Sequence, residues 1–334
     1  MEVEAKFWKQ KRADAIQCFL CPHQCVLKNG QKGICEVRVN KNNVLYTRNY
    51  GAVTSVANDP IEKKPLYHFR PGTLAFSLGT ASCNFKCLHC QNYTIAAYDI
   101  KQVPYWYMSP ESAVEKAIKN RCDGIAYTYN EPIIWYEYTY DTSKLAHEKG
   151  LYNVYVTNGY ITEEPLKEIA PYLDAMNIDI KGSDEFYKKV CKAKLEPVLN
   201  TSKIAKELGI HIELTYLIVP EYNDKSEDFE RFCDWVIDEL DENVPVHFSR
   251  FFPYYKMKDL YPTPISTMLK AYTVARAKGI NFVYLGNVGE MEYNNTYCPH
   301  CNHLLIERTG FGAMVVGLEG KKCKKCGKSI PIIL

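Results

Sequence analysis

The 334-residue sequence has no long apolar run, no excess of charge of one sign and no low-complexity tract. Without about 18 consecutive apolar residues it offers no candidate membrane helix. A net charge of +2 gives no general attraction to nucleic acid or to a membrane surface. The first residues, Met1-Glu2-Val3-Glu4-Ala5-Lys6, are charged and contain no apolar signal region. We therefore expect a cytoplasmic protein with no membrane partner and with nucleic acid disfavoured as a partner.

Cysteine is abundant by contrast, with 14 residues. Disulfide frameworks are typical of short secreted chains, so closely spaced cysteines in a long chain of this kind indicate metal binding in a reducing compartment. Cys122, Cys191 and Cys233 stand alone and are interpreted as buried helix residues with no special role. The others form three groups, which are Cys18, Cys21, Cys25 and Cys35, then Cys83, Cys87 and Cys90, and then Cys298, Cys301, Cys323 and Cys326.

Strand-like and helix-like stretches alternate in the middle of the chain, which predicts an α/β fold with helices flanking a parallel sheet. Seven strands do not fill an eight-unit barrel, so periodicity leaves a partial (β/α) barrel and a doubly wound sheet open. Either one places the active site at the carboxyl ends of the strands. The predicted strands are 74–78, 124–129, 153–157, 175–180, 211–219, 246–252 and 281–285, and the predicted helices are 109–121, 131–148, 162–172, 184–192, 195–208, 225–240 and 264–278.

This pattern divides the chain into three parts. Residues 1–72 form a Cys-rich, metal-binding segment, whose prolines and charges predict irregular, extended chain. Residues 73–289 form the α/β domain. Residues 290–334 form a segment with four cysteines and several lysines.

The middle cysteine group directly follows the first predicted strand and has the spacing CxxxCxxC, Cys83 to Cys90. Three thiolates in one tight loop can bind three irons of a [4Fe–4S] cluster and leave the fourth iron open to a ligand. The alternative is a zinc site with a distant fourth ligand.

At this point the sequence resembles the radical SAM enzymes. It is similar to the branch of the pyruvate formate-lyase-activating enzymes, and more closely to the radical SAM component of the AmmeMemoRadiSam group. The stretches that carry the resemblance are Cys21-Pro22-His23, Asp59-Pro60-Ile61-Glu62-Lys63-Lys64-Pro65-Leu66, Cys90-Gln91-Asn92 and Thr296-Tyr297-Cys298. The resemblance implies a partial TIM-like barrel, a [4Fe–4S] cluster, and reductive cleavage of S-adenosylmethionine (SAM) to a radical that takes hydrogen from a substrate.

The resemblance also implies SAM contacts at the strand ends. Glu131 stands where the family has Gly-Gly-Glu, although both glycines are absent, and Asn158-Gly159 matches a family turn. Asp179 and Lys181 match a stretch that the family has at its fourth strand. Because side chains alternate along a strand, these two are expected to point to the same side. The structural alternatives are a helix-start acid, an ordinary turn and an internal ion pair. Arg250 at the sixth strand and His89 beside Cys90, where a solvent-facing loop histidine is the alternative, complete the candidate set.

The outer cysteine groups are interpreted as two further metal sites, of which the terminal one is structural. Two CxxC pairs, beginning at Cys298 and Cys323, predict a zinc ribbon. The group from Cys18 to Cys35 fits zinc or an auxiliary Fe–S cluster, with zinc slightly preferred and His23 as a substitute ligand. The lysines around Cys326 are interpreted as solvated rather than as an RNA-binding patch.

The leading hypothesis is a radical SAM enzyme whose substrate is unknown and whose electron donor is a protein such as flavodoxin or ferredoxin. A glycyl-radical activase that acts on a protein partner is the alternative within this class. A non-catalytic, multi-zinc nucleic-acid-binding protein is the alternative of another class. It does not explain the CxxxCxxC spacing after a strand.

Overall fold

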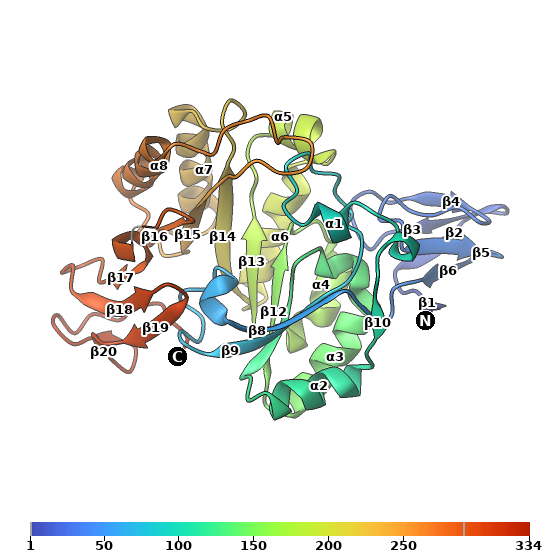
Figure 1. The fold of residues 1–334 in the computed structure, drawn as a ribbon, viewed down its shortest axis with the longest axis horizontal. Coiled ribbons are helices and arrows are strands. Elements are labelled where there is room, and N and C mark those ends of the chain that lie inside the picture. Colours follow the sequence, from blue (N-terminus) through green and yellow to red (C-terminus); the bar gives the residue numbers. More distant parts are fainter. Residues whose placement is uncertain (1, 290) are drawn as a thin grey trace.

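An eight-stranded sheet forms the centre of the molecule (Figure 1). The computed structural model describes residues 2–289 and 291–334. The seven predicted strands are all present, each within two residues of its expected bounds, and they are parallel neighbours in the order of the sequence. They are β9 (Leu74–Gly79), β11 (Gly124–Tyr127), β12 (Tyr152–Thr157), β13 (Ala175–Asp179), β14 (His211–Ile218), β15 (Val246–Arg250) and β16 (Val283–Gly286).

The eighth strand, β8 (Ser55–Pro60), lies antiparallel to β9 at one edge of the sheet. Among the described residues no ladder joins β8 to β16, so the sheet is an open, partial barrel rather than a closed one. The prediction of an irregular segment before residue 72 is therefore wrong for β8, and also for the short strands that precede it. Strand β8 contains polar residues and ends in a proline, so the sequence gives only a weak strand signal.

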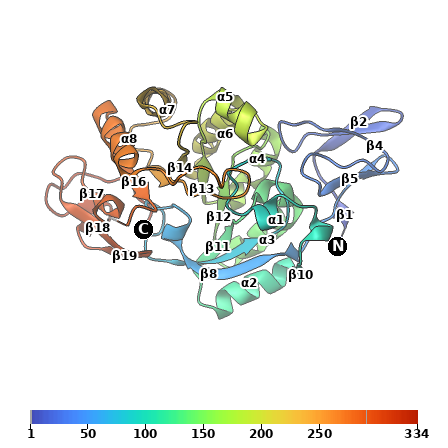
Figure 2. The same ribbon diagram turned by 45° about the horizontal axis from the view of Figure 1, so that its top comes forward.

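Helices cover the outer face of the sheet (Figure 2). They are α2 (Pro110–Lys119), α3 (Tyr136–Glu148), α4 (Glu163–Ile169), α6 (Glu196–Glu207), α7 (Ser226–Glu239) and α8 (Ile265–Lys278), with short turns α1 (Tyr93–Ala96) and α5 (Asp184–Phe186). The Ser109 hydroxyl accepts a hydrogen bond from Ser112 N and begins α2, as its Ser-Pro start predicts. Single 3-10 turns lie at Ile61–Lys63, Ile100–Gln102, Pro132–Trp135, Ala170–Tyr172 and Met291–Asn294, and one π turn lies at Tyr187–Cys191.

Small antiparallel sheets precede and follow this domain, at opposite ends of the molecule in Figure 1. The first part of the chain contains β1 (Val3–Glu4), β5 (Arg38–Lys41) and β6 (Val44–Thr47) in one sheet, β2 (Trp8–Arg12), β3 (Ala15–Cys18) and β4 (Val26–Lys28) in another, and β7 (Ala52–Val53) paired with β10 (Trp106–Tyr107). The last part contains β17 (Thr296–Tyr297), β18 (Leu304–Thr309), β19 (Gly312–Val315), β20 (Leu318–Glu319) and β21 (Lys322–Cys323).

The last part of the chain packs against the segment that precedes β9. Ile333 N donates to His68 O at 2.8 Å, and Arg70 N donates to Ile333 O at 2.7 Å. The His68 ring bonds Pro331 O at 2.9 Å and the Tyr284 hydroxyl at 2.7 Å. This end of the sheet is thereby covered by chain from both halves of the sequence.

A buried carboxylate holds the same end of the sheet together. Glu213, near the start of β14, is fully buried and accepts a bond from His68 N at 2.7 Å. The rings of His211 and His247 lie at 3.0 and 2.7 Å from its two oxygens. Burial by itself would raise the pKa of Glu213, but the bonds from His211 and His247 hold it well below its ordinary value.

We predict that Glu213→Ala lowers the free energy of unfolding by about 3–5 kcal/mol, because it leaves buried hydrogen-bond donors without their acceptor. Denaturant unfolding measures this, with Glu239→Ala in the exposed pair with Lys203 as the control, expected to cost about 1 kcal/mol or less. Since the folded pKa is depressed, the stabilisation is present above a pH of about 4.5 and is lost as the pH falls. Equal losses in the two variants would contradict this assignment.

Candidate active site

The carboxyl ends of the parallel strands surround a cavity of about 480 Å³. Its wall contains all three cysteines of the CxxxCxxC loop, which follows β9. Five of the six predicted SAM residues line it too, and they are His89, Glu131, Asn158, Asp179 and Lys181. The strand order therefore brings together residues that lie far apart in the sequence.

Arg250, the sixth candidate, has a different environment. It is not among the residues that line the cavity, whereas its neighbour Ser249 is. The guanidinium of Arg250 donates from Nε to Thr263 O at 2.7 Å and lies 5.1 Å from the centre of the Phe252 ring. These contacts fit a role in fixing the loop after β15.

Asparagine side chains hold the cysteine loop in place. Asn130 accepts from Thr80 N at 3.0 Å and donates to Ser82 O at 2.8 Å, so it fixes the chain that enters the loop. Asn158 donates to Asn84 Oδ1 at 2.8 Å, next to Cys83. Ser82 has a φ of 74°, a left-handed conformation that costs energy for a residue with a side chain and is maintained by such bonds.

The π turn supports the loop from the other side. Lys86 N donates to Cys191 O at 3.0 Å, and Leu88 N donates to Val190 O at 3.1 Å. Cys191, interpreted above as a lone buried residue, also has its thiol beside that of Cys87, where it raises the pKa of Cys87 together with burial. Cys191 is thus buried in a helical turn, as expected, and it also lies next to the cysteine loop.

The donor set fits a [4Fe–4S] cluster. Three thiols face one cavity, and burial raises the pKa of each, with Cys90 reaching about 11. Bound metal reverses this shift, because it stabilises the thiolate. Within the part of the chain that the structure describes, the Nδ1 atom of buried His89 has no hydrogen-bond partner, so the cavity wall carries a polar atom available to a ligand.

Glu131 joins the ends of two strands and also faces the cavity. One carboxylate oxygen accepts from the Thr157 hydroxyl at 2.6 Å, and the other accepts from Asn158 N at 2.8 Å. Burial raises the pKa of Glu131 to about 7, against the opposing effect of these donors. The following Gly159 has a φ of 68°, the left-handed turn expected at this position.

Asp179 and Lys181 lie side by side at the end of β13, as strand alternation predicts. Their side chains form an ion pair at 2.5 Å. Burial would lower the pKa of Lys181, but Asp179 and Cys87 raise it above its ordinary value, so the lysine stays charged. Two opposite charges, two residues apart in the sequence, thus face the cavity.

Lys64 is a cavity residue to which the sequence pattern assigned no site role. It lies on the segment between β8 and β9, is 2% exposed, and bonds Asp59 at 2.7 Å. Lys63, also in the cavity wall, bonds the same carboxylate at 2.9 Å. Two lysines facing one aspartate give this part of the wall a net positive charge. In the sequence, the signal that could have identified this residue was the Lys63-Lys64 pair, which lies in a stretch that carries the family resemblance.

Comparison with known proteins agrees with this geometry. Residues 78–236 match the model of the radical SAM superfamily. The chain is 52% identical to an uncharacterized protein of Methanocaldococcus jannaschii, over 99% of both chains. It is 25% identical over 141 residues to the (2S)-3-sulfopropanediol dehydratase activating enzyme of Klebsiella oxytoca, covering 40% of this chain and 44% of that one.

The chain belongs to the radical SAM superfamily, and it is an enzyme. The structure of Streptococcus suis SuiB bound to S-adenosylmethionine has the same fold, with a TM-score of 0.51 at 10% identity, over 65% of this chain and 52% of that one. Membership of this superfamily overturns the alternative of a non-catalytic zinc protein. Among the described residues, no helix of this radical SAM protein is long and apolar enough to cross a membrane.

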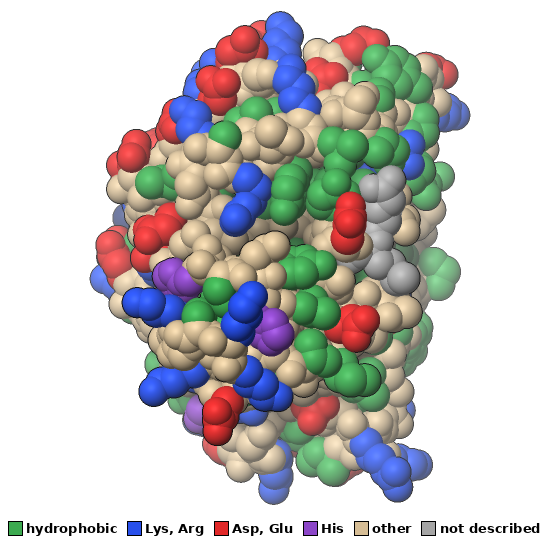
Figure 3. All heavy atoms as spheres, turned by 90° about the vertical axis from the view of Figure 1, so that its left-hand side faces the viewer, with side chains coloured by type: hydrophobic (Ala, Val, Ile, Leu, Met, Phe, Trp, Pro, Cys, Tyr) green, Lys and Arg blue, Asp and Glu red, His purple; other side chains and the backbone are tan. Residues whose placement is uncertain are grey.

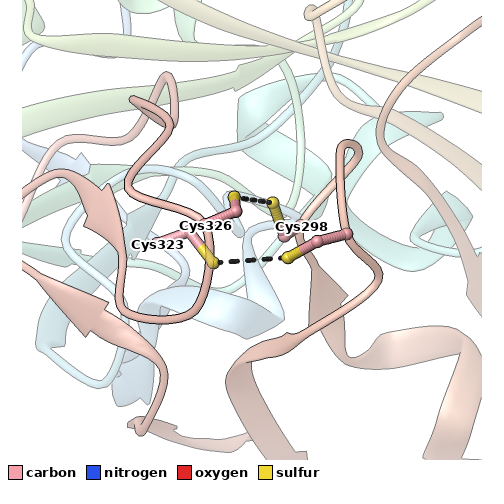
Figure 4. Close-up of side chains that lie close together, drawn as sticks. Cys298, Cys323 and Cys326 are labelled. Carbon is pink, nitrogen blue, oxygen red and sulfur yellow. Dashed lines mark hydrogen bonds between the residues drawn. The ribbon is translucent and has the colours of Figure 1, made fainter.

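The terminal cysteines of the radical SAM protein form a compact site (Figure 4). Cys298 Sγ lies 3.6 Å from Cys326 Sγ, and Cys301 Sγ lies 3.7 Å from Cys323 Sγ. Four sulfurs around one zinc are separated by roughly 3.8 Å, so this spacing fits a single ion. The nearby lysines, Lys321, Lys322, Lys324, Lys325 and Lys328, are exposed. In Figure 3, which shows this end of the molecule, basic side chains are scattered among apolar and acidic ones.

We predict that Asn130→Ala in this radical SAM protein loosens the cysteine loop, because it leaves Thr80 N and Ser82 O without their partner. The local cost is about 1–3 kcal/mol. Hydrogen exchange of the amides from residue 80 to 90 should accelerate correspondingly. Asn120→Ala, which removes an exposed bond to Asn58, is the control and should leave these amides unchanged. Equal exchange in both variants would show that Asn130 does not hold the loop.

Proposed function

We propose that this enzyme binds a [4Fe–4S] cluster through Cys83, Cys87 and Cys90 and uses it to cleave SAM. The supporting observation is the single cavity that contains these three thiols and the polar ends of β11, β12 and β13. When bound, the cluster supplies the electron that splits SAM into methionine and a 5′-deoxyadenosyl radical, which takes a hydrogen atom from the substrate. A flavodoxin- or ferredoxin-type protein delivers the electron.

The residues at the strand ends bind and orient SAM in this proposal. The carboxylate of Glu131 accepts from the SAM ammonium group, and Asn158 bonds the ribose or the carboxylate. Lys181 and Asp179 offer one charge of each sign to a ligand that itself carries both. Neutral His89, whose pKa burial lowers to about 3, donates a hydrogen bond toward the cluster sulfur or SAM.

The substrate occupies the remaining part of the cavity. The excess positive charge at Lys63 and Lys64 favours a substrate with an acidic group. We assign the enzyme to the AmmeMemoRadiSam group, on the motifs quoted above. A glycyl-radical activase acting on a protein partner is the second candidate, and the similarity to the Klebsiella oxytoca activating enzyme favours it.

The four terminal cysteines bind a structural zinc ion in this proposal. Their sulfurs leave no open position for a substrate, as in closed four-thiolate sites. Buried residues of the terminal segment, including Leu305, Ile306 and Ile330, pack with Phe282 and Tyr284 of the α/β domain. The zinc therefore stabilises a segment that covers the sheet.

Replacing Cys83, Cys87 and Cys90 together by Ala should remove about four irons per chain and abolish formation of 5′-deoxyadenosine, since the cluster loses every protein ligand. Metal analysis and product chromatography of anaerobically purified protein measure the two effects. The terminal zinc should remain and serves as the internal control for folding. Retained 5′-deoxyadenosine formation in the triple variant would refute the assignment of this loop.

The raised pKa of Glu131 predicts that the affinity for SAM depends on pH. Its pKa of about 7 reflects burial, and the neighbouring Asp179 also contributes to the rise. A bound ammonium group favours the carboxylate, so the affinity should rise about tenfold between pH 5.5 and 7, below the pKa of the amino group of SAM itself. Equilibrium dialysis measures this affinity.

Glu131→Gln should weaken SAM binding at pH 7 and flatten this pH profile. The matched control is Glu164→Gln at an exposed position of α4, which should keep the wild-type profile. A profile that stays steep in Glu131→Gln would exclude Glu131 as the titrating group.

A further inference from the structure

The first cysteine group surrounds a second and much smaller cavity, of about 20 Å³, outside the active site. All four thiols of the group line it, together with His23, Gly33 and Arg38 and the apolar residues Leu20, Ile34 and Ile134. Backbone bonds fold the chain around it, since Cys18 N donates to Cys25 O at 3.0 Å and Glu36 N donates to Gly33 O at 2.8 Å. Residues from two small sheets and the loop before α3 thus meet at one point.

Two of the four sulfurs face the same part of this cavity. A methyl group built on Gly33 would lie 3.6 Å from Cys25 Sγ and 3.6 Å from Cys35 Sγ, so these two sulfurs face the same small space. All four cysteines line this one cavity, so their thiolates would repel one another, and a shared bound cation relieves such repulsion.

The spacing of the sulfurs separates this site from the terminal one. Within residues 2–289 and 291–334, the terminal cysteines are the one set of three or more His, Cys, Asp and Glu residues whose ligand atoms all lie within 4.8 Å of one another. The first group and the Cys83 loop are both more open. A single zinc ion needs sulfurs roughly 3.8 Å apart. A cube needs wider spacing, because each sulfur lies beyond its own iron.

The hydrogen bonding around the second cavity suits an anionic cluster. Arg38 is buried, lines the cavity and donates from Nη1 to Cys18 Sγ at 3.6 Å. Among the described residues its Nε atom has no hydrogen-bond partner. Glu137 forms an ion pair with Nη2 of the same guanidinium and fixes its position. A hydrogen bond to a cysteine sulfur favours the reduced, more negative state of an iron–sulfur cluster.

Two hydrogen bonds connect this cavity directly to the active-site loop. His23 bonds Asn84 O at 2.8 Å, and the Ser82 hydroxyl donates to Cys35 O at 2.8 Å. Ser82 and Asn84 are the neighbours of Cys83 on both sides. Cys21 and Cys25 are only partly buried, so the second cavity also reaches toward the surface.

We propose that Cys18, Cys21, Cys25 and Cys35 hold a second iron–sulfur cluster, which passes one electron from a reduced flavodoxin- or ferredoxin-type protein to the cluster at Cys83, Cys87 and Cys90. The donor protein is oxidised by one electron, the active-site cluster is reduced by one, and no bond forms or breaks in this transfer. The binding site stands on its own geometry, whereas the electron transfer rests on the proposed function.

The test compares metal content in anaerobically prepared full-length variants. We expect about eight irons and one zinc in the unmodified protein, and about four irons and one zinc after replacement of Cys83, Cys87 and Cys90 by Ala, with the Mössbauer and EPR signals of one cluster. This variant leaves the second cavity intact, so the test does not depend on whether a first-group variant folds. Cys122→Ala, at a buried cysteine outside every group, is the control and should keep all eight irons.

Iron retained in the triple Ala variant supports the second cluster even if no SAM cleavage is ever found, so the two proposals can fail separately. A triple variant with two zincs, or with one zinc and no iron, overturns the second cluster. In the variant with Cys18, Cys21, Cys25 and Cys35 all replaced by Ala, the ratio of SAM cleavage driven by the reduced protein donor to that driven by dithionite should fall at least tenfold. An unchanged ratio overturns the electron transfer.

Discussion

The hydrogen bonds between parallel strands that follow one another in the sequence determine which side chains meet at the active-site cavity. Tyr127 is level with Tyr155, Thr157 with Ile178, and Asp179 with Thr215, so successive strands end at the same edge of the sheet. The next residues of each strand must therefore meet. The cysteine loop after β9 enters the same space because β9 is a parallel neighbour of β11. A slip of one residue in any of these registers would turn a cavity residue toward the helices.

The second requirement of the site is that its buried polar groups satisfy one another before any ligand binds. Asn130 and Asn158 each use their amide groups to hold the cysteine loop, and Glu131 accepts bonds from two neighbouring segments. These bonds maintain left-handed conformations at Ser82 and Tyr129, with φ of 74° and 72°. The cavity is thus preorganised by groups that also face its contents, so binding and local stability are coupled through the same side chains.

The sequence predicts the central domain well, because periodicity and helix ends are local signals. The Ser-Pro start of α2 and the glycines after α3, α6 and α8, which are Gly150, Gly209 and Gly279 with positive φ, show this agreement. The spacing of the cysteines along the sequence was enough to divide them into three groups. Other features depend on contacts between distant residues. Cys191 reaches Cys87 through a π turn, and Arg250 reaches Thr263 rather than the cavity. The first strands are short and are joined through residues in the left-handed conformation, such as Gln24 and Glu36. Such short strands show no alternation of apolar and polar residues that the sequence could reveal.

The contact between His68 and the last part of the chain has a consequence for the order of folding. The His68 ring meets Pro331 across 263 residues of sequence. Closing such a loop costs about 5 kcal/mol of chain entropy. During synthesis the segment around His68 leaves the ribosome long before its partners exist. The strands and loops that carry Cys83 and its neighbours are therefore complete while the opposite end of the sheet is still uncovered. Closure of this end of the sheet is therefore a late event, separated in time from the folding of those strands.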